Sequence, residues 1–459
     1  MGLEIMVALS LFCGSLDQTD APPEGRTRLI VLSDISSLTP GVAEPDDGQS
    51  LIRLMLYADE FDIEGLVATS NMGHGQRTRP DLIRQVVDAY EKVRPNLARH
   101  DPRYPLGGSL LRCIKAGQSL AGPKLPVEDS VGAGKDTEGS DWIIQVADRA
   151  DPRPVWVLIW GGSADLAQAL WRVRTNRTPE EVERFLAKLR VHAIGDQDST
   201  GPWIRAEFPG LYMITQRRAY RGMYRGGDGS LVSSDWVEAN IHGHGALGDL
   251  YPNYRGGDIW SRTLGPVRGI KEGDTPSFLS LIPNGLSDPG RPWLGSWGGR
   301  FQGNGSGLTD IPDTTTGASS DPDPRMSSVY RHRAAFQNDF AARLDWCVEP
   351  PSTANHHPIV KIAGGSSRVV AAGDSISLDA SCTIDPDGNA LSFRWTVDPT
   401  DTETAGSVTI QDGETAKPRI LVSPAPTAKL VSLLLTVSDD GRPSLTRYGR
   451  VLLEIKGSK

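Results

Sequence analysis

Strand-like apolar runs alternate with segments of helical spacing from Arg28 to Ile214, and this alternation limits the folds open to the chain more than any other feature. The strand-like runs cover residues 28–33, 63–70, 154–160, 190–194 and 211–214. The helical segments cover residues 50–58, 79–93, 141–150, 164–173 and 179–189. Such alternation indicates parallel strands, because each helix carries the chain back across the sheet. We therefore predict an α/β domain with a mostly parallel sheet in residues 26–347.

A different pattern follows the linker at residues 348–358. Short segments that alternate apolar and polar residues lie between turn signals such as Asp385-Pro-Asp-Gly388 and Asp439-Asp-Gly441. These segments cover residues 375–378, 391–396, 407–410, 429–438 and 447–455. Residues 359–459 are therefore predicted to form an all-β sandwich. Asp385, Asp387 and Asp439 are interpreted as turn-forming residues, with a structural calcium site as the alternative.

Composition and charge exclude some classes of function. With 459 residues, 38% of them hydrophobic and 23% charged, the chain has the composition of a globular protein with more than one domain. Its net charge of −9 argues against a nucleic-acid partner, because phosphate binding requires basic surfaces.

The N-terminal residues 1–25 form a candidate signal segment with Met6–Leu16 as its apolar core, although Glu4 occupies a place where basic residues are usual. A short buried helix and a wrongly assigned start are the alternatives. From the candidate signal segment we expect a secreted, extracellular protein. No other stretch has the roughly 20 apolar residues that span a bilayer, so we expect no membrane partner.

Carboxylates gather where the first predicted strand ends and the first predicted helix begins. Asp34 follows the strand at residues 28–33, and Glu44, Asp46 and Asp47 precede the helix. Ligands bind beyond the carboxyl ends of parallel strands, and adjacent carboxylates repel one another unless a cation lies between them. Oxygen ligands favour calcium or magnesium. Capping of the helix would explain one of these residues but not the cluster.

This cluster resembles the signature of the calcium-dependent nucleoside hydrolases, in which a strand runs into an Asp-rich loop that ends in Asp-Asp at the start of a helix. The resemblance is tightest to the branch described as nucleoside-hydrolase-like, cellulose-binding proteins. Matching segments cover residues 134–142, 160–164, 195–205, 242–248, 272–278 and 297–301. The resemblance implies a doubly wound sheet of the nucleoside-hydrolase type, followed by an immunoglobulin-like, PKD-like or cadherin-like sandwich.

The resemblance also implies a calcium site. The implied ligands are carboxylates and one backbone carbonyl, contributed by Asp34 or Glu44, Asp46, Asp47, Asp274 and Ala164. The insert Ile35–Ala43 expands the usual spacing, so either Asp34 or Glu44 can be the base that takes a proton from water. That water would attack an anomeric carbon through an oxocarbenium-like state.

Other residues are candidates for contact with a substrate. His244 is a candidate proton donor to a leaving oxygen and His242 a candidate substrate contact, with plain hydrogen bonding as the alternative for both. Candidates for contact with sugar hydroxyls follow predicted strand ends, namely Asn71, Gln197, Asp198, Trp203 and Arg205. Trp297 is a candidate for stacking on a sugar face. The alternatives are a turn at Asn71, core packing of Trp203 and a packed turn at Trp297.

Three functions follow from these features. The first is a secreted, calcium-dependent glycoside hydrolase that acts on a polysaccharide or oligosaccharide. The second is a non-catalytic cellulose-binding or carbohydrate-binding protein with the same fold. The third is a ribonucleoside hydrolase. Purine-preferring nucleoside hydrolases carry a His before the downstream metal-binding Asp, whereas Gly273 precedes Asp274 here, and this difference weighs against the third function.

Overall fold

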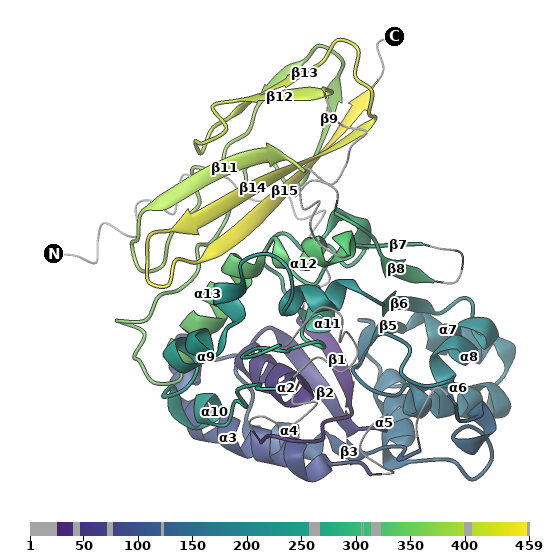
Figure 1. Cartoon of the computed structure of the whole chain (residues 1–459). Coiled ribbons are helices and arrows are strands. Elements are labelled where there is room, and N and C mark those ends of the chain that lie inside the picture. The colour runs from purple at the N-terminus through teal and green to yellow at the C-terminus, as the bar shows by residue number, and fades with distance from the viewer. Residues whose placement is uncertain are drawn as a thin grey trace. The chain divides into compact units, whose positions relative to one another are not determined.

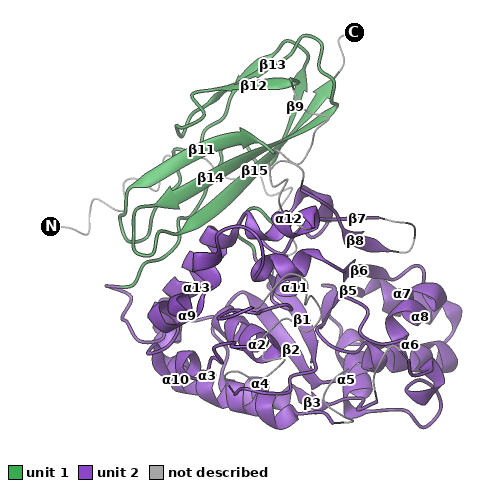
Figure 2. Cartoon of the chain, viewed as in Figure 1, with its two compact units in different colours: residues 1–24, 283–288, 354–459 green, residues 25–282, 289–353 purple. Residues whose placement is uncertain are grey.

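The computed structural model describes residues 25–39, 46–70, 77–120, 124–256, 267–303, 305, 307–313, 323–398 and 406–456. The chain divides into two compact units (Figure 2). The α/β unit comprises residues 25–282 and 289–353, and the sandwich unit includes residues 283–288 and the chain from Ala354 onward. The linker predicted at 348–358 thus contains the change of unit. The candidate signal segment lies almost wholly outside the described residues.

An eight-stranded sheet forms the centre of the α/β unit (Figure 1). Its strand order is β3-β2-β1-β4-β5-β6-β8-β7, and every neighbouring pair is parallel except β7 with β8. The strands are β1 (Thr27–Ser33), β2 (Phe61–Ala68), β3 (Ile114–Ala116), β4 (Val155–Ile159), β5 (Leu189–Ile194), β6 (Tyr212–Gln216), β7 (Phe301–Gly303) and β8 (Leu308–Asp310). The mostly parallel sheet predicted from the sequence is confirmed. The order runs outward in both directions from the β1–β4 pair, which creates a topological switch point there.

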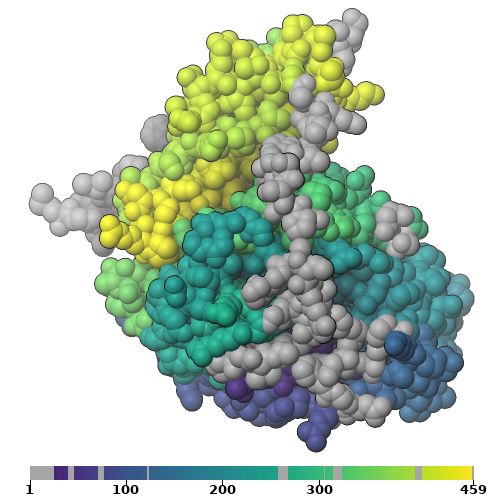
Figure 3. Space-filling view, viewed as in Figure 1, coloured from purple at the N-terminus to yellow at the C-terminus, as the bar shows by residue number. Residues whose placement is uncertain are grey.

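Helices connect the parallel strands. The helices are α2 (Asp46–Leu56), α3 (Pro80–His100), α4 (Gly107–Arg112), α5 (Glu138–Ala147), α6 (Ala164–Asn176), α7 (Pro179–Ala187) and α8 (Thr200–Glu207), followed by the shorter α9 (Ser234–Asn240), α10 (Gly245–Asp249), α11 (Pro276–Leu279) and α12 (Ser327–Tyr330), and by α13 (Arg333–Asp345). Helix α3 continues past its predicted end at residue 93 and through Pro95, because Leu97 extends its buried face. The teal atoms of the segment that carries α9 and α10 form part of the surface seen in Figure 3.

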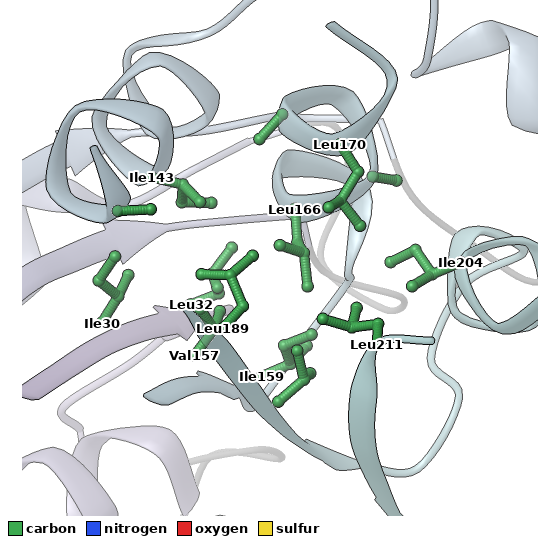
Figure 4. Packing of buried hydrophobic residues seen from close by; sticks show 14 of the residues in the cluster. Ile30, Leu32, Ile143, Val157, Ile159, Leu166, Leu170, Leu189, Ile204 and Leu211 are labelled. Atoms are coloured by element: carbon green, nitrogen blue, oxygen red, sulfur yellow. The ribbon is translucent and has the colours of Figure 1, made fainter. Parts of the chain in front are cut away.

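One apolar core fills the space between the sheet and the helices on one of its faces. All five residues of β4 are buried, as expected of a strand covered on both faces. Figure 4 shows side chains of the strands and of α5, α6 and α8 packed together, including Ile30, Leu32, Ile143, Val157, Ile159, Leu166, Leu170, Leu189, Ile204 and Leu211. This core holds β1 and β4 side by side. Among the described residues, no helix is long and apolar enough to cross a membrane.

The sandwich unit contains two sheets, with strand orders β10-β13-β12 and β11-β14-β15-β9. The strands are β9 (Ser367–Ala371), β10 (Ser375–Ser377), β11 (Leu391–Val397), β12 (Val408–Gln411), β13 (Arg419–Val422), β14 (Leu430–Asp439) and β15 (Thr446–Lys456). All neighbours are antiparallel except β15 with β9. Their alternate residues build a separate core around Trp395, Leu433 and Val451. The predicted all-β unit is confirmed.

A buried histidine makes the stability of the α/β unit depend on pH. His192 lies in β5 with no exposed surface, and its Nε2 is 3.0 Å from Gln216 Oε1. Burial lowers the pKa of His192 from 6.5 to about 4. The unfolded chain therefore binds a proton more readily, so the stability that neutral His192 provides at pH 7 is lost as pH falls from about 6.5 towards 4.

We expect this group to account for about 3 kcal/mol of that loss, at about 1.4 kcal/mol for each tenfold difference in proton affinity. Urea unfolding between pH 7 and pH 4.5 would show a shallower decline for His192→Gln than for the native protein. Equal slopes for the native protein and His192→Gln would contradict this assignment.

Candidate metal centre

The candidate site lies at the carboxyl ends of β1 and β4, where the strand order reverses. Asp34 directly follows β1, and Gly161 lies two residues past the end of β4. A Cβ atom added to Gly161 would lie only 2.5 Å from the Cβ of Asp34. Only glycine can therefore allow the chain after β4 to approach Asp34 this closely. Asp34 therefore lies where the first predicted strand ends, at the switch point of the sheet.

Three carboxylates from two distant segments meet beside this point. Asp46 and Asp47 are the first two residues of α2, and Asp274 lies two residues before α11. Each of the three offers an oxygen within 4.8 Å of the others. Asp47 and Asp274 are 5% and 2% exposed, and Asp46 is half-buried. The structure thus brings together Asp46, Asp47 and Asp274, the three aspartates that the family resemblance grouped as ligands.

The cluster resists ionisation. Burial and the charge of Asp46 raise the pKa of Asp47 to about 6, even though Ser33 Oγ donates a hydrogen bond of 2.5 Å to Asp47 Oδ1. Burial, together with the charges of Asp47, Asp46 and Asp34, raises the pKa of Asp274 well above its ordinary value. Like charges close together in a buried place need a counter-charge to remain ionised.

The donor set fits a hard cation. Asp274 Oδ2 is buried and has no hydrogen-bond partner among the described residues. A buried carboxylate oxygen is expensive to leave unpaired, so it is suited to bind an ion. The neighbouring donors are also carboxylate oxygens, which calcium and magnesium prefer. One protein cation lies nearby, because Lys271 Nζ is 3.6 Å from Asp46 Oδ2 and its side chain is 1% exposed.

Buried polar contacts hold the two acidic segments together. Arg53 of α2 donates two hydrogen bonds to the Glu272 carboxylate, of 2.5 and 3.1 Å, and neither side chain is exposed. Gln49 of α2 accepts a hydrogen bond of 2.7 Å from the Lys271 backbone N–H and donates one of 2.9 Å to the Gly269 carbonyl. Helix α2 is thereby joined directly to the segment that carries Asp274.

Neither Gln49 nor Arg53 was among the residues predicted from the sequence. Gln49 and Arg53 are four residues apart and so lie on one face of α2. They are the polar members of a buried, otherwise largely apolar helical face. That spacing was the signal available in the sequence, because fully buried polar side chains require partners.

Two family descriptions match parts of the chain. Residues 28–301 match the family described as "Cellulose-binding Sde182, nucleoside hydrolase-like domain", and residues 375–455 match "Cellulose-binding protein Sde0182, C-terminal domain". The chain belongs to this family. Its fold is nucleoside hydrolase-like, followed by a C-terminal region of mostly antiparallel β-sheets. No curated protein sequence matches the chain.

A solved structure similar over nearly the whole chain is that of a nucleoside hydrolase-related hypothetical protein from Saccharophagus degradans, described as associated with carbohydrate metabolism. It is 32% identical, covers 94% of this chain and 100% of its own, and gives a TM-score of 0.78. The PKD domain of the KIAA 1837 protein is 18% identical over 21% of this chain and 87% of its own, with a TM-score of 0.17. Mouse Cadherin-23 EC22–24 is 20% identical over 22% of this chain and 33% of its own, with a TM-score of 0.18. Scores this low support no inference about the sandwich.

The two predicted histidines have partners outside the acidic cluster of this family member. His242 Nδ1 is 2.9 Å from Glu238 Oε2, and His242 Nε2 is 2.9 Å from the Tyr251 carbonyl. His244 Nε2 is 3.2 Å from an Asp345 carboxylate oxygen on α13, and this hydrogen bond raises the pKa of His244. No contact among the described residues brings either imidazole to the cluster. Both histidines therefore fit the alternative interpretation, in which they are plain hydrogen-bonding residues.

Gln197 and Asp198 stabilise the loops at the strand ends. Gln197 Nε2 donates to the carbonyl of Trp160. Asp198 is 4% exposed, and it accepts hydrogen bonds of 3.0 Å from the Ser163 backbone N–H and 2.9 Å from the Thr200 backbone N–H. These contacts join the segments after β4 and β5. Asp198 in particular has no exposed face to offer to a substrate.

The other predicted substrate contacts are also mainly structural. Arg205 pairs with Asp196 at 2.7 Å, and Trp203 packs edge-on against Phe208 with ring centroids 5.7 Å apart. Trp297 is completely buried, so its ring cannot stack on a sugar. Contacts within the protein therefore account for these three side chains: an ion pair for Arg205, and packing for Trp203 and Trp297.

Three predicted positions remain open. Ala164 begins α6 and is fully buried, and its role as a backbone ligand stays a prediction. Glu44 and Asn71 lie outside the described residues. Between the two candidates for the base, Asp34 is therefore the one whose place in the fold is described.

Repulsion in the cluster predicts that removing a charge stabilises the cation-free protein. The folded-state pKa of Asp47, about 6, exceeds its ordinary value of 3.8, so ionised Asp47 lowers stability as pH rises through about 6. In the presence of chelator at pH 8, Asp47→Asn should raise the free energy of unfolding by about 2–3 kcal/mol. The advantage should shrink as pH falls towards 4, and chemical unfolding at both pH values measures it.

An exposed aspartate of α3 provides the matched control. Asp88→Asn makes the same change at a solvent-exposed position and should shift stability by less than about 0.5 kcal/mol. Destabilisation of the Asp47→Asn protein at pH 8 in chelator would contradict charge repulsion in the cluster.

Proposed function

We propose that this protein is a secreted, calcium-dependent hydrolase that cleaves glycosyl bonds of a polysaccharide or oligosaccharide. The observation that supports this function best is the buried Oδ2 atom of Asp274, which lies beside Asp46 and Asp47 and has no hydrogen-bond partner among the described residues. A surface that only contacts sugars does not need a group of buried carboxylates, whereas such a group is suited to hold a metal ion that activates a water for hydrolysis. The cellulose-binding description of the family supports a carbohydrate as the substrate.

Each acidic residue has a distinct role in this proposal. Asp46, Asp47 and Asp274 would hold the calcium ion, which when bound attracts sugar hydroxyls and makes a nearby water more acidic. Asp34 faces the same cluster, because its charge adds to those that raise the pKa of Asp274. We assign Asp34 as the base that takes the proton from the attacking water.

The chemical step is a hydrolysis. The water oxygen forms a bond to the anomeric carbon, the bond from that carbon to the leaving oxygen breaks, and the leaving oxygen takes a proton from solvent. The transition state has oxocarbenium character, so the carboxylates around it stabilise developing positive charge.

The geometry beside Asp274 argues against a ribonucleoside substrate. A Cβ atom at Gly273 would lie 3.3 Å from Asp46 Oδ2 and 3.5 Å from the Tyr220 ring. Tyr220 and Asp46 thus occupy the side on which purine-preferring hydrolases carry a His. Gly273 therefore supplies no imidazole that could protonate a purine leaving group.

A non-catalytic carbohydrate-binding protein is the second candidate, and one observation favours it. Lys271, buried beside Asp46, already offsets part of the negative charge of the cluster. A protein that uses the cluster only to grip sugar hydroxyls would bind cellulose and release no sugar.

A reducing-sugar release assay tests the proposal. Purified protein is incubated with cellulose, with plant and fungal polysaccharides and with nucleosides, in calcium or in chelator. We expect release from at least one glycan, and a decrease of at least about 100-fold in chelator and in Asp47→Asn, because the ion contributes several kcal/mol to catalysis. Asp88→Asn should keep full activity. Binding to cellulose without release would establish the non-catalytic candidate, and release only from nucleosides would establish the third function.

The Arg53–Glu272 pair should act on the metal centre through position. Arg53→Met removes the two hydrogen bonds that Arg53 donates to Glu272 and so loosens the segment that carries Asp274, and calcium should bind about 10–100-fold more weakly. Arg53→Lys keeps the charge and should recover part of the affinity. Calorimetric calcium titration measures both variants, and circular dichroism confirms that they are folded. Native calcium affinity in folded Arg53→Met would show that the pair only stabilises the core.

A further inference from the structure

Two carboxylates in the turns of the sandwich unit share an unusual hydrogen-bond pattern. Asp385 Oδ1 accepts hydrogen bonds of 2.9 Å from the backbone N–H groups of Asp387 and Asn389. Asp385 Oδ2 is buried and has no hydrogen-bond partner among the described residues. A turn-forming role explains the bonds to Oδ1 but leaves Oδ2 without a function.

Asp439 repeats this pattern in the turn at the end of β14. Its Oδ1 accepts three hydrogen bonds, from the Leu445 N–H at 2.9 Å, the Gly441 N–H at 3.0 Å and Asn355 Nδ2 at 3.1 Å. The side chain is 5% exposed, and its Oδ2 is buried without a partner in the described part of the chain. The three donors around Asp439 therefore all bond to Oδ1, and Oδ2 receives no hydrogen bond from the described residues.

The two turns are neighbours in the sandwich unit. Leu391, which follows the first turn, pairs with Asp439 at the end of β14, and the Asp440 N–H donates a hydrogen bond of 3.1 Å to the Ala390 carbonyl. Asn355 connects the two turns, because its Nδ2 donates to Asp439 and its Oδ1 accepts a hydrogen bond of 2.7 Å from Asn389 Nδ2. Among the described ion pairs, no Lys or Arg balances either Asp385 or Asp439.

We propose that Asp385 and Asp439 bind a divalent cation, calcium, through their Oδ2 atoms, with water completing the coordination. Hard oxygen ligands and the half-exposed turn at Asp385 suit calcium, which accepts several waters and a flexible geometry. Asp387 is excluded as a ligand here, because the His356 N–H and ring both contact its carboxylate, at 2.6 and 3.0 Å. This site lies wholly within the sandwich unit and does not depend on the proposed function of the α/β unit.

Two carboxylates alone predict moderate affinity. Calcium sites of extracellular modules have dissociation constants of roughly 0.1–1 mM. The ion would join the 385–389 turn to the 439–445 turn and so slow local opening of both. At about 10 mM calcium, amide exchange in these turns should slow by about tenfold, since the ion binds only the closed form.

Hydrogen-exchange mass spectrometry of the full chain tests this site. Chelator-treated protein is compared with protein in calcium chloride up to about 10 mM, and peptides that cover residues 385–389 and 439–445 are followed. We expect calcium to slow amide exchange in these peptides, both in the native protein and in Asp47→Asn. That variant lacks one carboxylate of the other acidic cluster. Asp439→Asn should lose the calcium effect. It should still fold, because an Asn oxygen can accept the three hydrogen bonds that Asp439 Oδ1 receives.

The neighbouring carboxylate supplies a matched control. Asp440 is exposed, and its Oδ1 accepts a hydrogen bond of 2.8 Å from the Ala390 N–H, which an Asn oxygen can also accept. Asp440→Asn should therefore respond to calcium as the native protein does. Absence of any calcium effect on these peptides in the native protein overturns the proposal, whatever the variants do. A calcium effect that persists in Asp439→Asn also overturns it.

Discussion

Repulsion between buried carboxylates at the carboxyl end of β1 is the constraint on which the rest of the α/β unit depends. The dipole of α2 favours negative charge at Asp46 and Asp47, and Ser33 donates to Asp47, but Asp274 lacks any such support at Oδ2. The segment around Asp274 would move away from α2 if the chain were free to relax. The fully buried Arg53–Glu272 pair prevents this, because separating it would leave two unpaired charges in the core.

The same constraint explains the composition of the neighbouring segments. Gly161 allows the chain after β4 to pass against Asp34, where any side chain would collide. Lys271 supplies one positive charge beside Asp46, which is fewer than the three clustered carboxylates require. The cluster therefore keeps an excess of negative charge that an added cation can balance. In the proposed function, a bound cation would relieve this repulsion and stabilise the folded protein.

The sequence predicted the parts of this architecture that depend on local pattern. Strand and helix alternation located β1 and β4, and the position of acidic residues at strand and helix ends located Asp34, Asp46 and Asp47. The roles of individual loop side chains were harder to predict. Whether an imidazole such as His244 or an indole such as Trp297 faces a site depends on how distant segments pack. Turn residues and spacing do not contain that information.

The sandwich turns show the same limit at the level of single atoms. In the sequence, Asp385 and Asp439 look like ordinary turn-forming residues, and the hydrogen bonds to their Oδ1 atoms agree. The distinction between a turn and a cation site depends on the second oxygen, whose partners come from tertiary structure. A turn-forming Asp on a surface gives that oxygen to water. Here both Oδ2 atoms are shielded from water and lack donors among the described residues, so turn formation alone leaves two negative charges uncompensated.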